Sequence, residues 1–169
     1  MENQSVDVAA ATPATTLAGV KVMVIDDSNT IRRSAEIFLV QAGCQVILAD
    51  DGFDALAKIT DHQPDLIFCD IVMPRLDGYQ TCALIKRNHR FAATPVVMLS
   101  SKDGLFDRAR GRMVGSDEYL TKPFTKDSLL RTVDMHTAGR REGAAAAVRD
   151  DVDMDFTEAN HADPKNPNR

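Results

Sequence analysis

The chain has 169 residues, enough for one ordinary domain with length to spare, and its 44% hydrophobic and 27% charged residues are typical of a globular protein. A net charge of -5 argues against non-specific binding to nucleic acid or to an anionic membrane surface. No apolar run approaches the roughly 20 residues that cross a bilayer, and no secretory signal is apparent at the N-terminus. The three cysteines lack a metal-type spacing, so we expect a reducing, cytoplasmic location without membrane insertion.

Short apolar runs alternate with amphipathic helical patterns through the middle of the chain. The runs, each predicted to be a strand, are Val20–Ile25, Val46–Leu48, Leu66–Cys69, Val96–Leu99 and Tyr119–Leu120. Apolar residues three or four apart predict helices after each run, at Ile31–Ala42, Ala55–Ile59, Tyr79–Ile85, Leu105–Met113 and Leu129–Val133. In the fourth of these, Leu105, Ala109 and Met113 form the expected apolar stripe.

This alternation predicts an α/β fold with a five-stranded parallel sheet and helices on both faces. Right-handed crossovers leave few strand orders, of which the flavodoxin-like order 2-1-3-4-5 is common. We expect the domain to occupy residues 19–136. Residues 1–18 are rich in small side chains and predict a flexible N-terminal arm, while the low-complexity, acidic residues 137–169 predict a disordered C-terminal tail.

Polar side chains follow four of the five predicted strands. Asp26 and Asp27 follow the first, Asp70 the third, Ser100 the fourth and Lys122 the fifth. In open parallel sheets ligands bind outside the carboxyl ends of the strands, at the point where the strand order reverses. We therefore expect these side chains to converge on one site.

Three converging carboxylates would repel one another, raise at least one pKa and favour a bound cation. Mg²⁺ suits such a site, because it prefers one or two carboxylates together with water and phosphate oxygens. A hydroxyl, a lysine and a cation around one carboxylate are groups that stabilise a phosphoryl group during transfer.

Each of these residues also has a simpler interpretation. Asp70 could cap its strand, Asp27 or Ser28 could cap the following helix, and Ser100 could be a helix cap or turn residue. Lys122 could be a solvated surface lysine. We favour a shared site because all of them fall at the same edge of one sheet.

Taken together, the motifs resemble the response-regulator receiver domain of bacterial two-component signalling, from about Gly19 to His136. The motifs are Asp26-Asp27-Ser28, Asp70 with Met73-Pro74 and Asp77-Gly78, Ser100, and Lys122-Pro123-Phe124. More narrowly, residues 51–56, 76–82 and 100–106 resemble the stand-alone, chemotaxis-type regulators of type IV pilus twitching motility. Ser100 stands where threonine is commoner in the family.

The resemblance implies that Asp70 accepts a phosphoryl group from the phosphohistidine of a histidine kinase. It implies Mg²⁺ held by Asp27, Asp70 and the main-chain carbonyl of Val72, with Asp26 acting through water. It also implies that Lys122 contacts the acyl phosphate, that Ser100 swings toward the phosphoryl oxygens and Tyr119 moves inward behind it, and that the peptide bond before Pro123 is cis.

No DNA-reading module or output enzyme is recognisable after His136, so we expect signalling through protein docking rather than an enzyme or a nucleic-acid binder. The resemblance places the docking surface on the fourth helix, fifth strand and fifth helix, at about Leu105–Val133. A phosphate sink that drains a shared kinase remains an alternative. A phosphatase of the haloacid-dehalogenase type is a poorer one, because it needs an acid where Val72 stands.

Hydrolysis of an acyl phosphate needs a water in line with the phosphorus, and the side chains of Val72 and Lys102 are best placed to affect it. Val72 offers no hydrogen bond and Lys102 is a donor only, so we expect slow self-dephosphorylation.

Overall fold

The computed structural model describes residues 17–101 and 105–139, without the side chains of residues 105–107. The chain divides into two units, residues 1–136 and 137–169. The predicted N-terminal arm and C-terminal tail fall almost entirely outside the described residues and stay predictions. Within the described ranges, no helix is both long and apolar enough to cross a membrane.

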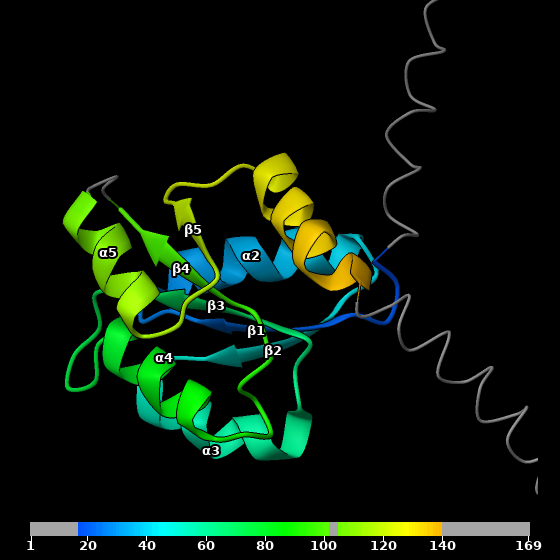
Figure 1. The fold of residues 1–169 in the computed structure, drawn as a ribbon. Coiled ribbons are helices and arrows are strands. Elements are labelled where there is room, and N and C mark those ends of the chain that lie inside the picture. The colour runs from blue at the N-terminus through cyan, green and yellow to red at the C-terminus, as the bar shows by residue number, and fades with distance from the viewer. Residues whose placement is uncertain (1–16, 102–104, 140–169) are drawn as a thin grey trace, which may run out of the picture. The chain divides into compact units, whose positions relative to one another are not determined.

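All five predicted strands are present and form one parallel sheet. They are β1 (Lys21–Ile25), β2 (Gln45–Ala49), β3 (Leu66–Asp70), β4 (Val96–Ser100) and β5 (Glu118–Thr121). The sheet order is β2-β1-β3-β4-β5, which confirms the predicted order (Figure 1). Every residue of β3 and β4 is buried, as expected for central strands covered on both faces.

Helices follow the strands at the predicted places. They are α2 (Asn29–Gln41), α3 (Gly52–His62), α4 (Gly78–Arg87), α5 (Leu105–Met113) and a final helix of residues 126–139. Ser28, Asp51 and Asp77 cap α2, α3 and α4 by accepting a main-chain N–H bond from three residues further on. Ser28, rather than Asp27, is therefore the cap of the first helix.

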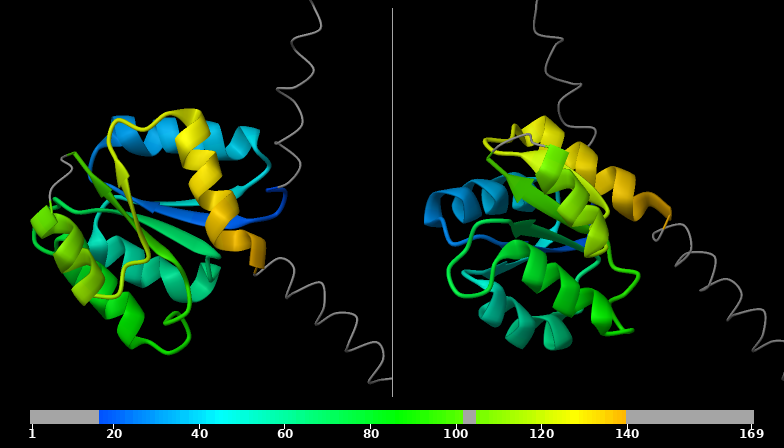
Figure 2. Two further views of the ribbon diagram at one scale, coloured as in Figure 1. Left: turned by 45° about the horizontal axis from the view of Figure 1, so that its top comes forward. Right: turned by 60° about the vertical axis from the view of Figure 1, so that its left-hand side comes forward.

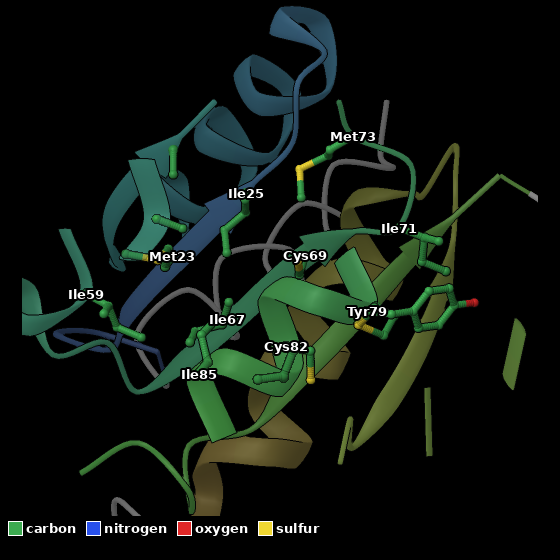
Figure 3. Packing of buried hydrophobic residues seen from close by; sticks show 14 of the residues in the cluster. Met23, Ile25, Ile59, Ile67, Cys69, Ile71, Met73, Tyr79, Cys82 and Ile85 are labelled. Atoms are coloured by element: carbon green, nitrogen blue, oxygen red, sulfur yellow. The ribbon is translucent and has the colours of Figure 1, made fainter. Parts of the chain in front are cut away.

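The helices cover both faces of the sheet and enclose two apolar cores. Figures 1 and 2 show α2 and the 126–139 helix on one face, with α3 and α4 on the other. Met23 and Ile25 of β1 point toward the α3 and α4 side (Figure 3), whereas Val22 and Val24 belong to the core beneath α2. This alternation follows from the two-residue period of a strand, and both faces are apolar because both are covered.

The apolar stripe predicted for α5 is wrong. Ala109 is exposed, the Met113 side chain is 85% exposed, and the side chain of Leu105 lies outside what the structure describes. Among residues 108–113 of α5, for which burial is described, the buried position is Gly111, where an added Cβ would lie 2.7 Å from Ser116 Oγ. Glycine at this position lets α5 pack closely against Ser116. The spacing of apolar residues therefore did not identify the packed face of this helix.

Gly78 closes the loop between β3 and α4 directly beside the end of β3. Its N–H donates to the carbonyl of Ile71 at 2.8 Å. A Cβ added there would lie 2.2 Å from the Asp70 carbonyl oxygen and 2.7 Å from Ile71 Cα, and neither main-chain atom can move freely. The chain can therefore pass under Asp70 only with glycine at this position.

We predict that Gly78→Ala lowers the free energy of unfolding by about 1–3 kcal/mol, the usual range for overpacking. Gly139→Ala is the matched control, because nothing lies within 4 Å of a Cβ there. Urea denaturation of both variants measures the effect. Equal stabilities of the two variants would contradict the close approach at Gly78.

Candidate functional site

Three carboxylates meet at the carboxyl edge of the sheet. Asp26, Asp27 and Asp70 each offer an oxygen, and these atoms lie within 4.8 Å of one another. Because Ile25 pairs with Cys69 in the register of β1 and β3, the acids that follow these two residues emerge side by side. Asp26 and Asp70 are buried and Asp27 is exposed, so the cluster is open to solvent on one side.

Lys122, at the end of β5, is ion-paired with two of these acids. Its Nζ donates to Asp70 Oδ1 at 2.9 Å and to Asp26 Oδ2 at 3.3 Å. The side chain is only 16% exposed, so it is not a solvated surface lysine. Its N–H donates to the Ser100 carbonyl at 2.6 Å, and the following bond to Pro123 is cis, as the family resemblance implied.

Asp26 is fixed by two further hydrogen bonds, one to its buried carboxylate and one to its main chain. Its Oδ1 accepts the Ser28 N–H at 2.8 Å, and its main-chain carbonyl accepts Arg32 Nη1 at 2.5 Å. A buried carboxylate needs such partners to offset its lost hydration. The role of Arg32 was not predicted, because a contact with a main-chain carbonyl leaves no sequence signature.

The electrostatics leave the cluster short of positive charge. Burial raises the pKa of Asp70 to about 6, the negative charge of Asp26 adds to the rise, and Lys122 opposes it. The predicted rise of a pKa therefore occurs at Asp70, with burial rather than repulsion as its largest cause. Burial also disfavours the charged form of Lys122, but its bonds to Asp70 and the charge of Asp26 outweigh this and raise the lysine pKa. Three acids facing one ammonium group are a donor set that fits a hard divalent cation.

A pocket opens over this cluster. It is lined by Asp27, Asp70, Ile71, Val72, Leu99, Ser100, Ser101 and Lys122. Ser100 is 4% exposed and Val72 is 74% exposed, and both line this pocket together with Asp27 and Asp70. Lys102 lies outside the described residues.

Tyr119 is not part of the acidic pocket. It lies on β5, paired with Met98, and lines a separate hollow with Arg108, Arg112 and Ser116. Its hydroxyl is buried without a hydrogen-bond partner among the described residues. The ring itself packs against the core, and the guanidinium carbon of Arg108 lies 5.9 Å from its centre.

We predict that Asp70→Asn raises stability in Mg²⁺-free buffer above about pH 6, by about 1–3 kcal/mol, because the native pKa is raised from 3.8 to about 6. The native state binds the proton more readily than the unfolded chain, so the ionised carboxylate of Asp70 lowers the stability of wild type, and this penalty is fully present above the native pKa. It fades as the pH falls toward the unfolded pKa. Urea denaturation between pH 4 and pH 8 measures it.

Asp54→Asn is the control with the opposite trend. Although burial opposes it, hydrogen bonds from Asp50 and Lys58 hold the pKa of Asp54 below its usual value. This substitution should cost stability at neutral pH, and the loss should shrink as the pH falls. A constant difference between Asp70→Asn and wild type at every pH would contradict the assignment of a raised pKa.

Comparison with known proteins agrees with this geometry. The response regulator receiver domain family matches residues 22–134. Protein PilG of Pseudomonas aeruginosa is 70% identical over 118 residues, covering 70% of this chain and 87% of PilG. Protein PilH of the same organism is 34% identical over 119 residues, covering 70% of this chain and 98% of PilH. The solved structure of the Vibrio cholerae chemotaxis protein CheY4 superposes with a TM-score of 0.68 at 33% identity, covering 70% of this chain and 98% of CheY4. The chain therefore belongs to the response regulator receiver domain family.

Proposed function

We propose that this protein is a stand-alone response regulator that takes a phosphoryl group onto Asp70 from the phosphohistidine of a histidine kinase. The observation that carries the proposal is the convergence of three carboxylates and Lys122 at one edge of the sheet, where Asp27, Asp70 and Lys122 line an open pocket. Similarity to PilG, PilH and a chemotaxis protein supports a role in chemotaxis-type control of type IV pilus twitching motility. Three free cysteines among the described residues are compatible with work in the reducing cytoplasm.

In the proposed reaction an oxygen of Asp70 bonds to phosphorus as the phosphorus–nitrogen bond of phosphohistidine breaks, and the histidine, protonated beforehand on its other ring nitrogen, leaves as neutral imidazole. Asp27, Asp70 and the Val72 carbonyl would hold Mg²⁺, with Asp26 acting through water. The ion would neutralise charge on the phosphoryl oxygens. Lys122 Nζ lies 2.9 Å from Asp70 Oδ1, so it would be within reach of the phosphoryl oxygens once the acyl phosphate forms.

Signalling in this proposal follows from a change near Ser100 and Tyr119. Ser100 would donate a hydrogen bond to a phosphoryl oxygen, and Tyr119 would move inward behind it. Their strands pair, since Ser100 faces Thr121 and Met98 faces Tyr119 in the β4–β5 register. The change would reach a docking surface on α5, β5 and the helix that begins at residue 126, about Leu105–Val133.

A phosphatase is not favoured. Such an enzyme needs a second acid two residues beyond its nucleophilic Asp, and Val72 occupies that position with an exposed apolar side chain. A valine can neither donate nor accept a proton. The proposed chemistry is therefore limited to the protein's own phosphorylation and slow dephosphorylation.

Intact mass spectrometry after incubation with acetyl phosphate and Mg²⁺ tests the proposal. We expect wild type to gain one phosphate, only with Mg²⁺, and Asp70→Asn to gain none. Asp77→Asn is the matched control, because this acid lies in the same loop and asparagine can keep its cap on α4. Full labelling of Asp70→Asn would rule out Asp70 as the acceptor.

We further predict that Val72→Asn shortens the lifetime of the phosphorylated form by roughly 10-fold to 100-fold, because its amide can orient the attacking water. Val72→Ala, which uncovers the site without adding an amide, should change the rate far less. Phosphate release in Mg²⁺ buffer after removal of the donor measures both. An unchanged or slower rate in Val72→Asn would show that water positioning here does not limit the lifetime.

A further inference from the structure

The loop that carries Val72 is fixed at its two ends but exposed between them. At one end the Ile71 N–H donates to the Leu99 carbonyl at 3.1 Å, and at the other Gly78 bonds back to Ile71 at 2.8 Å. Between them Met73 is buried, while Val72, Pro74 and Arg75 are exposed. Within the loop the Leu76 N–H also donates to the Pro74 carbonyl at 2.8 Å, which closes a tight turn, so a contact with another element is what would fix the direction of this exposed turn.

Arg75 supplies such a contact, to a segment 24 residues earlier in the chain. Its Nη2 donates to Asp51 Oδ2 at 2.5 Å, and its guanidinium carbon lies 5.3 Å from the centre of the Phe53 ring. Asp51 is itself fixed, because its other oxygen caps α3 by accepting the Asp54 N–H at 2.8 Å. Arg75 thus joins the exposed part of the loop to the rigid start of α3.

The main chain at Arg75 is in a conformation that an arginine does not favour. Its φ is +69°, in the left-handed region. In the described part of the chain one other non-glycine residue has positive φ, Gln63, and it ends α3, where this conformation is common. Arg75 ends no helix, and an unfavoured main-chain angle persists only where its surroundings hold it. At Arg75 the angle occurs in the middle of the tight turn that the Leu76 N–H closes on the Pro74 carbonyl.

Global stability does not explain the contact. The Arg75 side chain is 65% exposed and that of Asp51 21%, and exposed pairs of this kind add little to the stability of a fold. The effect of the pair is therefore local, on the conformation of the loop.

We propose that Arg75 is a positioning residue for the cation site. By bonding Asp51 and stacking on Phe53, it holds the β3–α4 loop, in which Val72 lines the pocket with Asp27 and Asp70, in a conformation that lets the Val72 carbonyl serve as a ligand. Arg75 itself touches neither the cation nor the phosphoryl group. The inference rests on the proposed function, since it needs a cation at Asp27 and Asp70.

The test compares Mg²⁺ affinity, by calorimetry, in two variants whose charge effects have opposite signs. Arg75→Gln removes a positive charge, which by electrostatics alone would tighten Mg²⁺ binding. Asp51→Asn removes a negative charge, which would weaken it, and keeps an oxygen that can cap α3. Positioning instead predicts that both variants weaken binding, by about threefold to tenfold.

Lys58→Gln is the matched control. Lys58 forms a comparable pair with Asp54 at 2.9 Å on α3, but it bonds the Leu48 carbonyl rather than the β3–α4 loop. This variant should leave the Mg²⁺ affinity within twofold of wild type. The double variant with Arg75→Gln and Asp51→Asn should bind no more weakly than either single variant, because both remove the same contact.

Two further readouts separate positioning from general destabilisation. Without Mg²⁺, the amides of residues 72, 73, 75 and 76 should exchange with deuterium faster in Arg75→Gln, while the thermal midpoint stays close to wild type. Arg75→Lys, which keeps the charge, should recover part of the lost affinity.

Opposite shifts in Arg75→Gln and Asp51→Asn, or affinities within twofold of wild type in both, would overturn the proposal. Equal weakening in Lys58→Gln would overturn it as well. A wild type that binds no Mg²⁺ would instead overturn the proposed function, and the positioning role with it.

Discussion

The site depends on two carboxylates that are almost completely removed from water. Asp26 is 0% and Asp70 3% exposed, and neither position would tolerate a charge without compensation. Lys122 bridges both, yet one ammonium group cannot neutralise three neighbouring acids. Burial is the largest cause of the raised pKa of Asp70, and the negative charge of Asp26 adds to it. A bound cation, or a phosphoryl group together with its counter-ion, would therefore reduce the excess negative charge around Asp70.

The sheet makes this environment available through its topology. The order in which successive strands are added reverses between β1 and β3, so the helices that follow these two parallel strands lie on opposite faces and leave the acids at the strand ends without a helix directly over them. Lys122 follows β5, an edge strand of the sheet, and reaches the same acids although it lies 96 residues along the chain from Asp26. Gly78 then lets the next helix begin directly beneath Asp70.

The residues around the pocket differ in how firmly hydrogen bonds hold them and in how exposed they are. Asp26 is held by Ser28, Arg32 and Lys122, whereas Asp27 is exposed and the loop at Val72 is exposed too. A site that must admit a large donor protein needs an open side, and the open side needs contacts such as that between Arg75 and Asp51 to keep its shape. The exposed ion pair thus matters more for local geometry than for the stability of the fold.

The sequence by itself determined the strands, their order, the helices on both faces and the convergence of acids, serine and lysine at one edge. Hydrophobic periodicity encodes which residues are buried, and strand-end polar residues must share an edge once the sheet is parallel. It failed at α5, where Gly111 rather than the apolar stripe makes the packing contact, and it missed Arg32 and Arg75. Only the tertiary structure decided that burial, more than repulsion, raises the pKa of Asp70, and that Lys122 pairs with both buried acids. Those facts depend on how far each side chain is enclosed and on contacts between residues distant in the chain, and local patterns in a single sequence record neither.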